Sequence, residues 1–283
     1  MSVDAVLLAA ASAFLFGAMT VAIRIALGRG AGAEGGALFT VLTALAVTLP
    51  FTLAEGSGVT ELWPFLLAGA LGPGLSQLLF TLAVREAGPS RTSVVVGTAP
   101  LYSVAIALVL LGEPLEAGLA AGALLIVAGG VLLVGERDRP EHVRILGLGF
   151  ALAATIVFAV RDNFVRWLAI DTEVAPGPAT AATLAAGAAV IALYVIVSRA
   201  PLRSEDARAF IPAGALFGLS YVCLFEAYYR GPVTVVSPLV ATESLWGVVL
   251  SAVVLERSER VGVRLLAGAL LVVSGGILIG AFR

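Results

Sequence analysis

Apolar residues in this chain come in long runs that are separated by short polar or Gly- and Pro-containing breaks. A helical run of about 20 apolar residues spans the hydrocarbon core of a bilayer, which is roughly 30 Å thick. Each run therefore predicts one transmembrane helix. The ten predicted spans are 5–27, 36–54, 63–84, 92–111, 117–135, 145–170, 178–197, 209–229, 233–255 and 262–282.

The longest polar segment, residues 136–144, contains the single histidine, His142, and divides the chain almost in half. We therefore expect a first five-helix unit over residues 1–135, a polar linker over 136–144 and a second five-helix unit over 145–283. Breaks elsewhere are as short as Gly112-Glu113-Pro114. Such short connections predict that consecutive helices are antiparallel neighbours.

Composition supports an all-α polytopic membrane protein, because 60% of the residues are hydrophobic and only 13% are charged. A soluble domain has about 25% charged residues. All 17 basic residues are arginine and none forms a polybasic patch, so we expect no nucleic-acid partner. Cys223 is the only cysteine, which excludes an internal disulfide and a cysteine-based zinc site. We expect no metal or cofactor.

An internal repeat relates the two halves of the chain. Phe16 and Arg24 fall on Phe158 and Arg166 at an offset of 142 residues. Residues 74–77 match residues 218–221 at an offset of 144, and residues 121–130 match 267–276 at 146. Because each copy has five spans, the second copy enters the membrane from the opposite side. Inverted repeats of this kind are typical of secondary transporters, although a duplication without a transport role is the alternative.

The helix ends of the two copies also resemble a known family. Gly-Glu-Pro at 112–114 is followed by GALLIVAGG at 122–130, and the pattern returns as Leu-Glu-Arg at 255–257 followed by GALLVVSGG at 268–276. This resembles the drug/metabolite transporter superfamily in its EamA-like branch, which has two five-helix repeats. The resemblance covers the whole chain. It implies a central cavity lined mainly by the first, third, fourth, sixth, eighth and ninth helices, with the fifth and tenth outside it.

The resemblance also implies a carrier of small solutes, often an exporter, and not an enzyme. We expect a multi-pass protein of the bacterial inner (plasma) membrane. The residues agree in excluding an intramembrane protease, because no histidine lies in any predicted span and no His-Glu-x-x-His run is present.

Ionisable residues inside the predicted spans gather in the second half, where they are costly unless paired or functional. Asp162 and Arg166 are four residues apart, so they can form an ion pair within their helix. Arg161 points about 100° away from Asp162 and has no predicted partner in its own helix. Glu243, near the middle of the span 233–255, has none either.

We therefore expect Arg161 and Glu243 to face one cavity, either bonded to each other or binding the two ends of a substrate. A zwitterion such as an amino acid would fit, with the guanidinium binding its carboxylate and Glu243 or Asp162 binding its ammonium. Glu243 is also the candidate for proton coupling, because proton loss from a carboxyl group on one side can accompany substrate binding.

Several softer candidates add aromatic and amide groups, which suit an amphipathic solute but also serve ordinary packing. The full set of predicted substrate-binding residues is Arg161, Asp162, Asn163, Glu243, Trp246, Tyr221, Gln77 and Tyr102. Pro73, Pro100 and Pro238 interrupt their helices and are predicted hinges, because proline frees a backbone carbonyl.

The predicted function is secondary active transport of small metabolites such as amino acids, in the direction of export and by alternating access. Its partners are the substrate, the lipid bilayer and protons, and the protein is a monomer or a homodimer. One alternative is a carrier of sugar phosphates or nucleotide sugars, which would want more cationic groups in the cavity. A channel is the other alternative.

Arginine placement predicts the orientation. Leaving out Arg24, Arg161 and Arg166 inside the spans, the loops after odd-numbered spans hold 12 arginines and the other segments hold 2. The positive-inside rule then places those loops in the cytoplasm and both termini outside.

Overall fold

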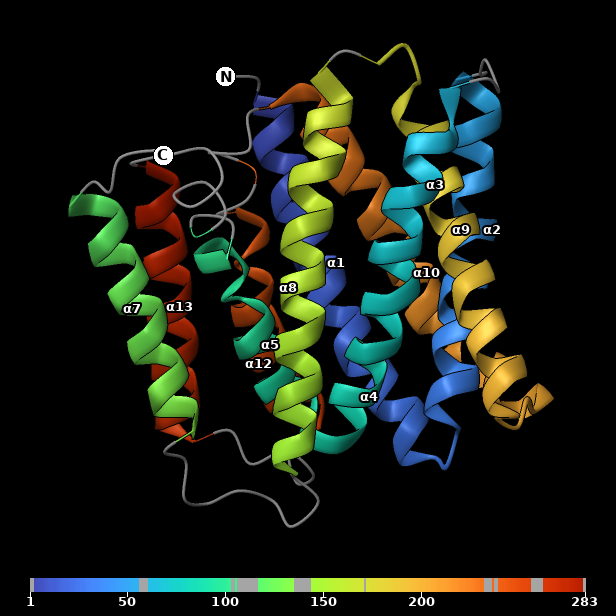
Figure 1. Cartoon of the computed structure of the whole chain (residues 1–283). Helices are drawn as coiled ribbons and strands as arrows, with labels where there is room; N and C mark the ends of the chain where they lie inside the picture. The colour runs from blue at the N-terminus through green and yellow to red at the C-terminus, as the bar shows by residue number, and fades with distance from the viewer. Residues whose placement is uncertain are drawn as a thin grey trace.

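The structure is a computed structural model of the chain and describes residues 3–55, 61–102, 105, 117–134, 144–170, 172–231, 236, 239–255 and 262–281. These residues are almost entirely helical and include no strand (Figure 1). The elements of the first half are α1 (Val3–Gly28), α2 (Ala33–Glu55), α3 (Trp63–Gly69), the π-helix η2 (Ala70–Ser76), α4 (Gln77–Ala87), α5 (Pro89–Val96) and α7 (Ala117–Val134). Those of the second half are α8 (Ile145–Ile170), α9 (Pro176–Ser198), α10 (Ser204–Arg230), α12 (Glu243–Val254) and α13 (Val263–Ala281).

Six helical stretches among the described residues are long and apolar enough to cross a membrane. They are Asp4–Gly28, Ala33–Glu55, Trp63–Ala87, Ile145–Ala169, Pro176–Ser198 and Ser204–Arg230. The stretch Trp63–Ala87 combines α3, η2 and α4. Shorter apolar helices lie within α7, α12 and α13. The prediction of a helical membrane protein is therefore confirmed, whereas the number of ten spans stays a prediction, and of the predicted linker only Arg144 is described.

The two halves of the bundle interleave instead of standing side by side (Figure 1). Helix α1 packs on α10, and α8 packs in the same way on η2 and α4. Helix α12 contacts α1, and α5 contacts both α8 and α12. Helix α2 contacts its equivalent α9, and α7 contacts its equivalent α13. The packing of α1 on α10 and that of α8 on η2 and α4 are thus counterparts with the copies exchanged, as expected of an inverted repeat.

Helices α7 and α13 form a separate pair at one side of the bundle (Figure 1). A Cβ atom added at Gly122 would lie 2.8 Å from the Gly275 carbonyl oxygen, and one added at Gly129 would lie 2.7 Å from the Gly268 carbonyl oxygen. Small residues let helices approach this closely in a membrane. Gly122 of α7 therefore packs against Gly275 of α13, and Gly129 packs against Gly268, so the two helices run antiparallel.

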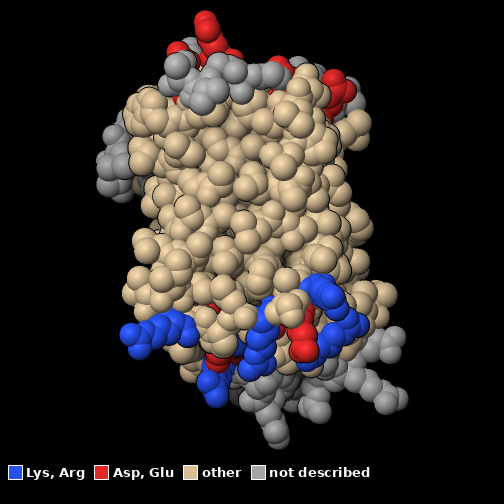
Figure 2. Space-filling view, turned by 90° about the vertical axis from the view of Figure 1, so that its right-hand side faces the viewer, with Lys and Arg blue, Asp and Glu red and all other residues tan. Residues whose placement is uncertain are grey.

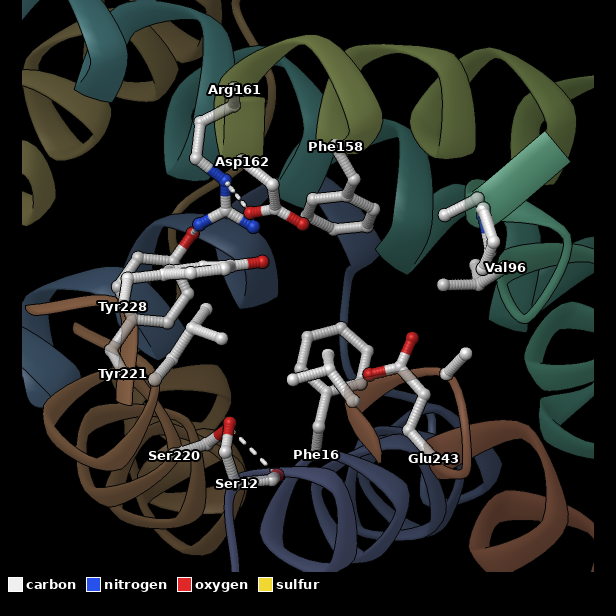
Figure 3. A pocket seen from close by; sticks show the side chains of 15 residues that line it. Ser12, Phe16, Val96, Phe158, Arg161, Asp162, Ser220, Tyr221, Tyr228 and Glu243 are labelled. Carbon is white, nitrogen blue, oxygen red and sulfur yellow. Dashed lines mark hydrogen bonds and ion pairs between the residues drawn. The ribbon is translucent and has the colours of Figure 1, made fainter. Parts of the chain in front are cut away.

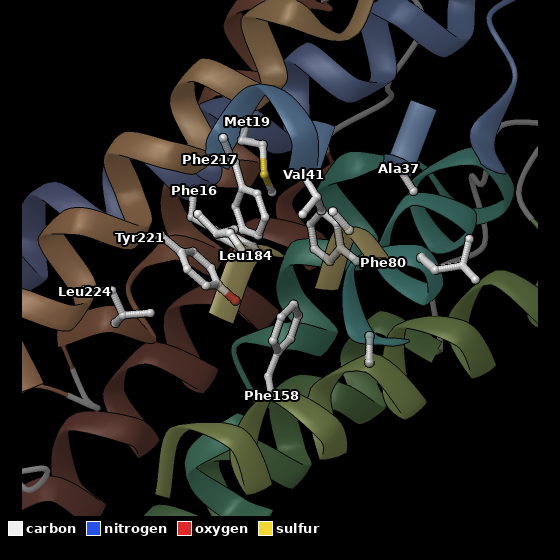
Figure 4. Packing of buried hydrophobic residues seen from close by; sticks show 14 of the residues in the cluster. Phe16, Met19, Ala37, Val41, Phe80, Phe158, Leu184, Phe217, Tyr221 and Leu224 are labelled. Atoms are coloured by element: carbon white, nitrogen blue, oxygen red, sulfur yellow. The ribbon is translucent and has the colours of Figure 1, made fainter. Parts of the chain in front are cut away.

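A cluster of aromatic rings joins the two halves at the centre of the molecule (Figure 4). The Phe16 ring makes edge-to-face contacts with Phe80, Phe158 and Phe217, at centroid distances of 5.1, 5.9 and 6.2 Å. Such contacts are a favoured geometry for aromatic pairs. Phe16 and Phe158 are repeat equivalents that touch each other, so the internal symmetry axis of the bundle passes close to them.

The face shown in Figure 2 has a belt without charged residues between two charged ends. Arginines and acidic residues mix at one end, where Arg85 contacts Glu34 at 3.1 Å and Glu86 at 2.8 Å. Large apolar side chains are exposed in the middle of helices, as Leu124 of α7 and Ile156 of α8 are. Lipid is the solvent that suits such a belt, while the direction of insertion stays a prediction.

Candidate functional site

A narrow pocket lies at the centre of the bundle, where α1, α8 and α10 meet the helix breaks next to α5 and α12 (Figure 3). It lies beside the aromatic cluster and draws residues from both repeats. The lining residues are Ser12, Phe16, Val96, Ala99, Pro100, Phe158, Arg161, Asp162, Ser220, Tyr221, Leu224, Tyr228, Val240, Ala241 and Glu243. The third predicted helix, formed by α3, η2 and α4, contributes none of them.

Two matching helix breaks form one wall of this pocket. Helix α5 ends before a turn at residues 97–98, and α12 begins after a turn at residues 241–242. The Thr98 hydroxyl donates to the Val95 carbonyl oxygen at 2.6 Å, and its repeat equivalent Thr242 donates to the Leu239 carbonyl oxygen at 2.6 Å. Irregular backbone at membrane depth is tolerated where it lines a cavity.

The break changes the expected setting of Glu243. This residue is the first of α12 and follows a turn, whereas the sequence had predicted a position near the middle of the span 233–255. Pro100 lies just after the equivalent break and lines the pocket. Pro73 lies inside the π-helix η2. Pro238 lies outside the described residues.

Arg161 is almost completely buried, with 3% of its surface exposed, and its charge is well compensated. Its Nε lies 2.8 Å from Asp162 Oδ1, and its Nη1 donates a hydrogen bond to the Tyr221 hydroxyl. The guanidinium carbon lies 5.0 Å from the centre of the Tyr221 ring and 5.4 Å from that of Phe158. A desolvated guanidinium over aromatic faces gains cation–π attraction in addition to its ion pair.

The pairing corrects two sequence expectations. Asp162 pairs with Arg161, not with Arg166, and Arg161 does have a partner in its own helix. Arg166 instead donates from Nη1 to the Tyr228 carbonyl oxygen at 2.6 Å. The long arginine side chain folds back toward Asp162 alongside Gly72 of η2, where an added Cβ atom would lie 2.7 Å from Arg161 Cγ.

Glu243 is also buried, with 8% of its surface exposed, and it lines the pocket across from Arg161 and Asp162 (Figure 3). No salt bridge joins Glu243 to any residue that the structure describes, and the charges of Asp162 and Arg161 act on it through space. Ser12 and Ser220 add hydroxyl groups to the lining of the pocket. The Ser220 hydroxyl donates a hydrogen bond to the Ser12 carbonyl oxygen at 3.0 Å. The pocket thus presents one guanidinium, two carboxylates and hydroxyl groups on an aromatic background.

Four of the eight predicted substrate-binding residues line the pocket: Arg161, Asp162, Glu243 and Tyr221. The other four lie outside its lining. Asn163 donates from Nδ2 to the Ala159 carbonyl oxygen at 2.8 Å, and the Trp246 ring packs edge-on against Phe14 at 5.2 Å. Tyr102 is half-buried beyond the break after α5. Gln77 is completely buried at the start of α4.

Sequence reasoning did not propose Ser12 or Tyr228 as site residues. Tyr228 follows Tyr221 by seven residues, which places both on one face of α10. Ser12 precedes Phe16 by four residues and shares its face of α1. Helical spacing from residues already singled out was therefore the signal that would have found them.

Two interleaved inverted repeats around a buried, charged pocket are the architecture of a membrane transport protein. The model of the EamA-like transporter family matches residues 4–135 and 145–281. The chain therefore belongs to the EamA-like transporter family of the drug/metabolite transporter superfamily, and it is a membrane transporter.

A solved crystal structure superimposes on this chain with a TM-score of 0.71. It is 23% identical in sequence, and the match covers 98% of this chain and 96% of the other. At this identity the likeness shows the fold alone. Comparison with curated proteins gives no match.

Proposed function

We propose that the protein is a secondary active transporter that exports small amphipathic metabolites, amino acids among them, across the inner membrane of a bacterium by alternating access. One observation carries the proposal: Arg161, Asp162 and Glu243, from helices α8 and α12, line a single buried pocket between the inverted repeats. Ionisable groups at this depth are too costly to persist in a membrane without a role or a partner.

The pocket chemistry suits a zwitterion. Arg161 uses Nε for Asp162 and Nη1 for Tyr221, and a guanidinium has five N–H donors, so Nη2 is the group to bind a substrate carboxylate. Glu243, which has no salt bridge with a described residue, is the group to bind the ammonium. Phe16 and Phe158 supply an apolar surface for the rest of the solute.

Proton coupling rests on Glu243 in this proposal. The charged groups that face it are Asp162 and Arg161 from α8, and the hydroxyl-bearing Ser12 and Tyr228 line the same pocket. A proton on Glu243 and a substrate ammonium would compensate the same carboxylate, so they compete for it. A proton that binds Glu243 from the side to which the pocket is open would then displace the substrate toward that same side, so protons and substrate would cross the membrane in opposite directions.

A sugar-phosphate or nucleotide-sugar carrier is less well supported. Among the described residues that line the pocket, Arg161 is the single cation, and it already compensates Asp162. Glu243 leaves the lining with a net negative charge, which opposes the binding of a phosphate dianion.

A thermal-shift screen of the purified protein against amino acids, amines, nucleosides and sugar phosphates tests the substrate class. A ligand at about 100 times its Kd stabilises the native state by about 2.7 kcal/mol, which raises the Tm. We expect amino acids or similar zwitterions to raise it, whereas stabilisation by sugar phosphates alone would overturn the assignment.

Transport is then measured with the identified ligand in proteoliposomes. A carrier shows saturable flux and counterflow, in which unlabelled substrate on one side drives labelled substrate against its gradient. Fast flux that does not saturate would instead identify a channel.

A further inference from the structure

Gln77 is a buried amide for which no described residue is a hydrogen-bond partner. It begins α4 directly after the π-helix η2, and none of its surface is exposed. Neither Nε2 nor Oε1 has a hydrogen-bond partner among the residues that the structure describes. Leaving both polar atoms of an amide unpaired in a dry interior is unfavourable, so the group calls for a partner that this conformation does not supply.

The internal repeat shows where that partner belongs. At the offset of 144 residues, Gln77 falls on Tyr221, which lines the pocket and accepts a hydrogen bond from Arg161. At the offset of 142, Arg161 and Asp162 fall on Met19 and Thr20. Met19, Thr20 and Gln77 are all completely buried. The first repeat therefore contains a counterpart of one pocket wall, formed by Met19, Thr20 and Gln77, and in this conformation the three residues are buried.

We propose that this counterpart opens toward the opposite side of the membrane during transport, and that Gln77 then binds the substrate there. The inference rests on the proposed alternating access, because inverted repeats exchange conformations when such a transporter changes its open side. An amide offers a donor to a carboxylate and an acceptor to an ammonium, so it suits the same zwitterionic substrate. Being neutral, it holds that substrate more weakly than Arg161 and Glu243 do, which favours release on its side.

The π-helix η2 connects the two sites physically. Gly72 of η2 lies against the Arg161 side chain, and Gln77 follows five residues later. Pro73 lies within η2 and removes one backbone N–H from its ladder. Isolated π-helical turns are frequent at functional sites. A shift of Arg161 when substrate leaves would thus press on the segment that positions Gln77.

The variant Gln77→Leu tests the proposal, because its Tm and its counterflow should change in opposite directions. In Gln77→Leu, an apolar side chain of similar size replaces the unpaired amide, so we expect the Tm to rise. Counterflow should fall at least tenfold, while ligand affinity in the thermal-shift assay stays within twofold of wild type. A lower Tm with unchanged counterflow would overturn the inference, and so would no change in either. Gln77→Met provides a second apolar side chain in case the leucine fails to fold.

Thr81→Val is the matched control, because its buried hydroxyl is satisfied by the Gln77 carbonyl oxygen at 2.9 Å. This variant should transport as wild type does. Counterflow by the wild-type protein tests the proposed function separately, so failure of that function and failure of the Gln77 site are distinguishable.

Chemical labelling tests the opening itself. In a Cys223→Ser background, which has no other cysteine, Gln77→Cys and Tyr221→Cys each introduce one thiol. In proteoliposomes, with and without the identified ligand, a membrane-impermeant thiol reagent should label the two positions from opposite sides of the membrane. Labelling of both from the same side, or no labelling of Gln77→Cys from either side, would contradict the proposal.

Discussion

The two repeats build the same backbone and fill its centre with different chemistry. On the second repeat, α8 presents Arg161 and Asp162 to the pocket, and α12 begins with Glu243. The equivalent positions of the first repeat are Met19 and Thr20, and at the offset of 144 that relates Thr242 to Thr98, Glu243 falls on Ala99. One half therefore supplies the charges of the pocket, whereas the other supplies neutral side chains.

This difference shows that the duplicated fold and the site chemistry are separable. Packing symmetry survives in pairs such as Thr98 and Thr242, which make the same hydrogen bond in both copies. A buried cation needs neighbours that compensate it, and Asp162 and Tyr221 of the second repeat do so for Arg161. In the proposed mechanism this asymmetry gives the two faces of the carrier different affinities, and it can be tested by converting second-repeat residues into their first-repeat equivalents.

Arg161→Met should have the largest effect, abolishing counterflow by at least 100-fold. It removes the cation of the pocket and leaves the Asp162 carboxylate without its partner, which costs about 3–5 kcal/mol for a buried pair. The double variant Arg161→Met with Asp162→Thr copies the first repeat. It should regain the Tm, because replacing a whole buried pair is often neutral, yet it should remain inactive. Normal transport by either variant would refute the role of this pair.

Glu243→Gln should lower counterflow about tenfold and remove its dependence on pH, because an amide cannot carry the proton. The measurement is substrate uptake with and without an imposed pH gradient. Glu226→Gln is the control, since Glu226 pairs with Arg230 at 2.7 Å near the end of α10 and does not line the pocket. If the Glu243 variant still responded to the gradient, the proton-coupling role would be wrong.

Gly72→Ala should weaken substrate affinity by about threefold to tenfold. The added Cβ would lie 2.7 Å from Arg161 Cγ, so the arginine must shift, at a cost of about 1 kcal/mol for mild overpacking. The equivalent position of the second repeat is Leu216, where no arginine stem needs the space. Gly149→Ala, with nothing within 4 Å of its Cβ, should bind substrate as wild type does.

Gly129→Ala should affect stability and leave substrate affinity unchanged. Its Cβ would lie 2.7 Å from the backbone oxygen of Gly268, which cannot rotate away, so we expect a loss of about 1–3 kcal/mol and a lower Tm. Gly149→Ala again serves as the control. A changed Kd would show that the pair α7 and α13 takes part in the site.

Much of the fold was predictable because span length and repeat matches are local properties of the chain. The repeat match of residues 121–130 with 267–276 was read from the sequence, whereas the close packing of these glycines against each other is seen in the structure. The resemblance placed the fifth and tenth helices outside the cavity, and their residues are absent from the described lining. Pro100 and Pro238 predicted interruptions of these two helices, but the sequence did not indicate that the turns lie at residues 97–98 and 241–242.

The candidate site was predictable in its charges and not in their pairing. Arg161, Asp162 and Glu243 could be singled out because placing an ionisable side chain inside a membrane span costs free energy. Helical geometry then favoured Asp162 with Arg166, yet the flexible Arg161 side chain folds back because Gly72 of another helix leaves room for it. Gln77 looked equivalent to Tyr221 from the sequence, but in this conformation it lies outside the pocket.

The amino-acid sequence alone thus determines which segments are apolar helices of membrane-spanning length, and that the second half of the chain is an inverted repeat of the first. Both properties follow from the order of apolar and polar residues along the chain. Side-chain partners arise from contacts between segments more than a hundred residues apart. The pairing of Arg161, the break before Glu243 and the closure around Gln77 are consequences of that packing, in which a missing Cβ or an unpaired amide changes the balance among nearly equal arrangements.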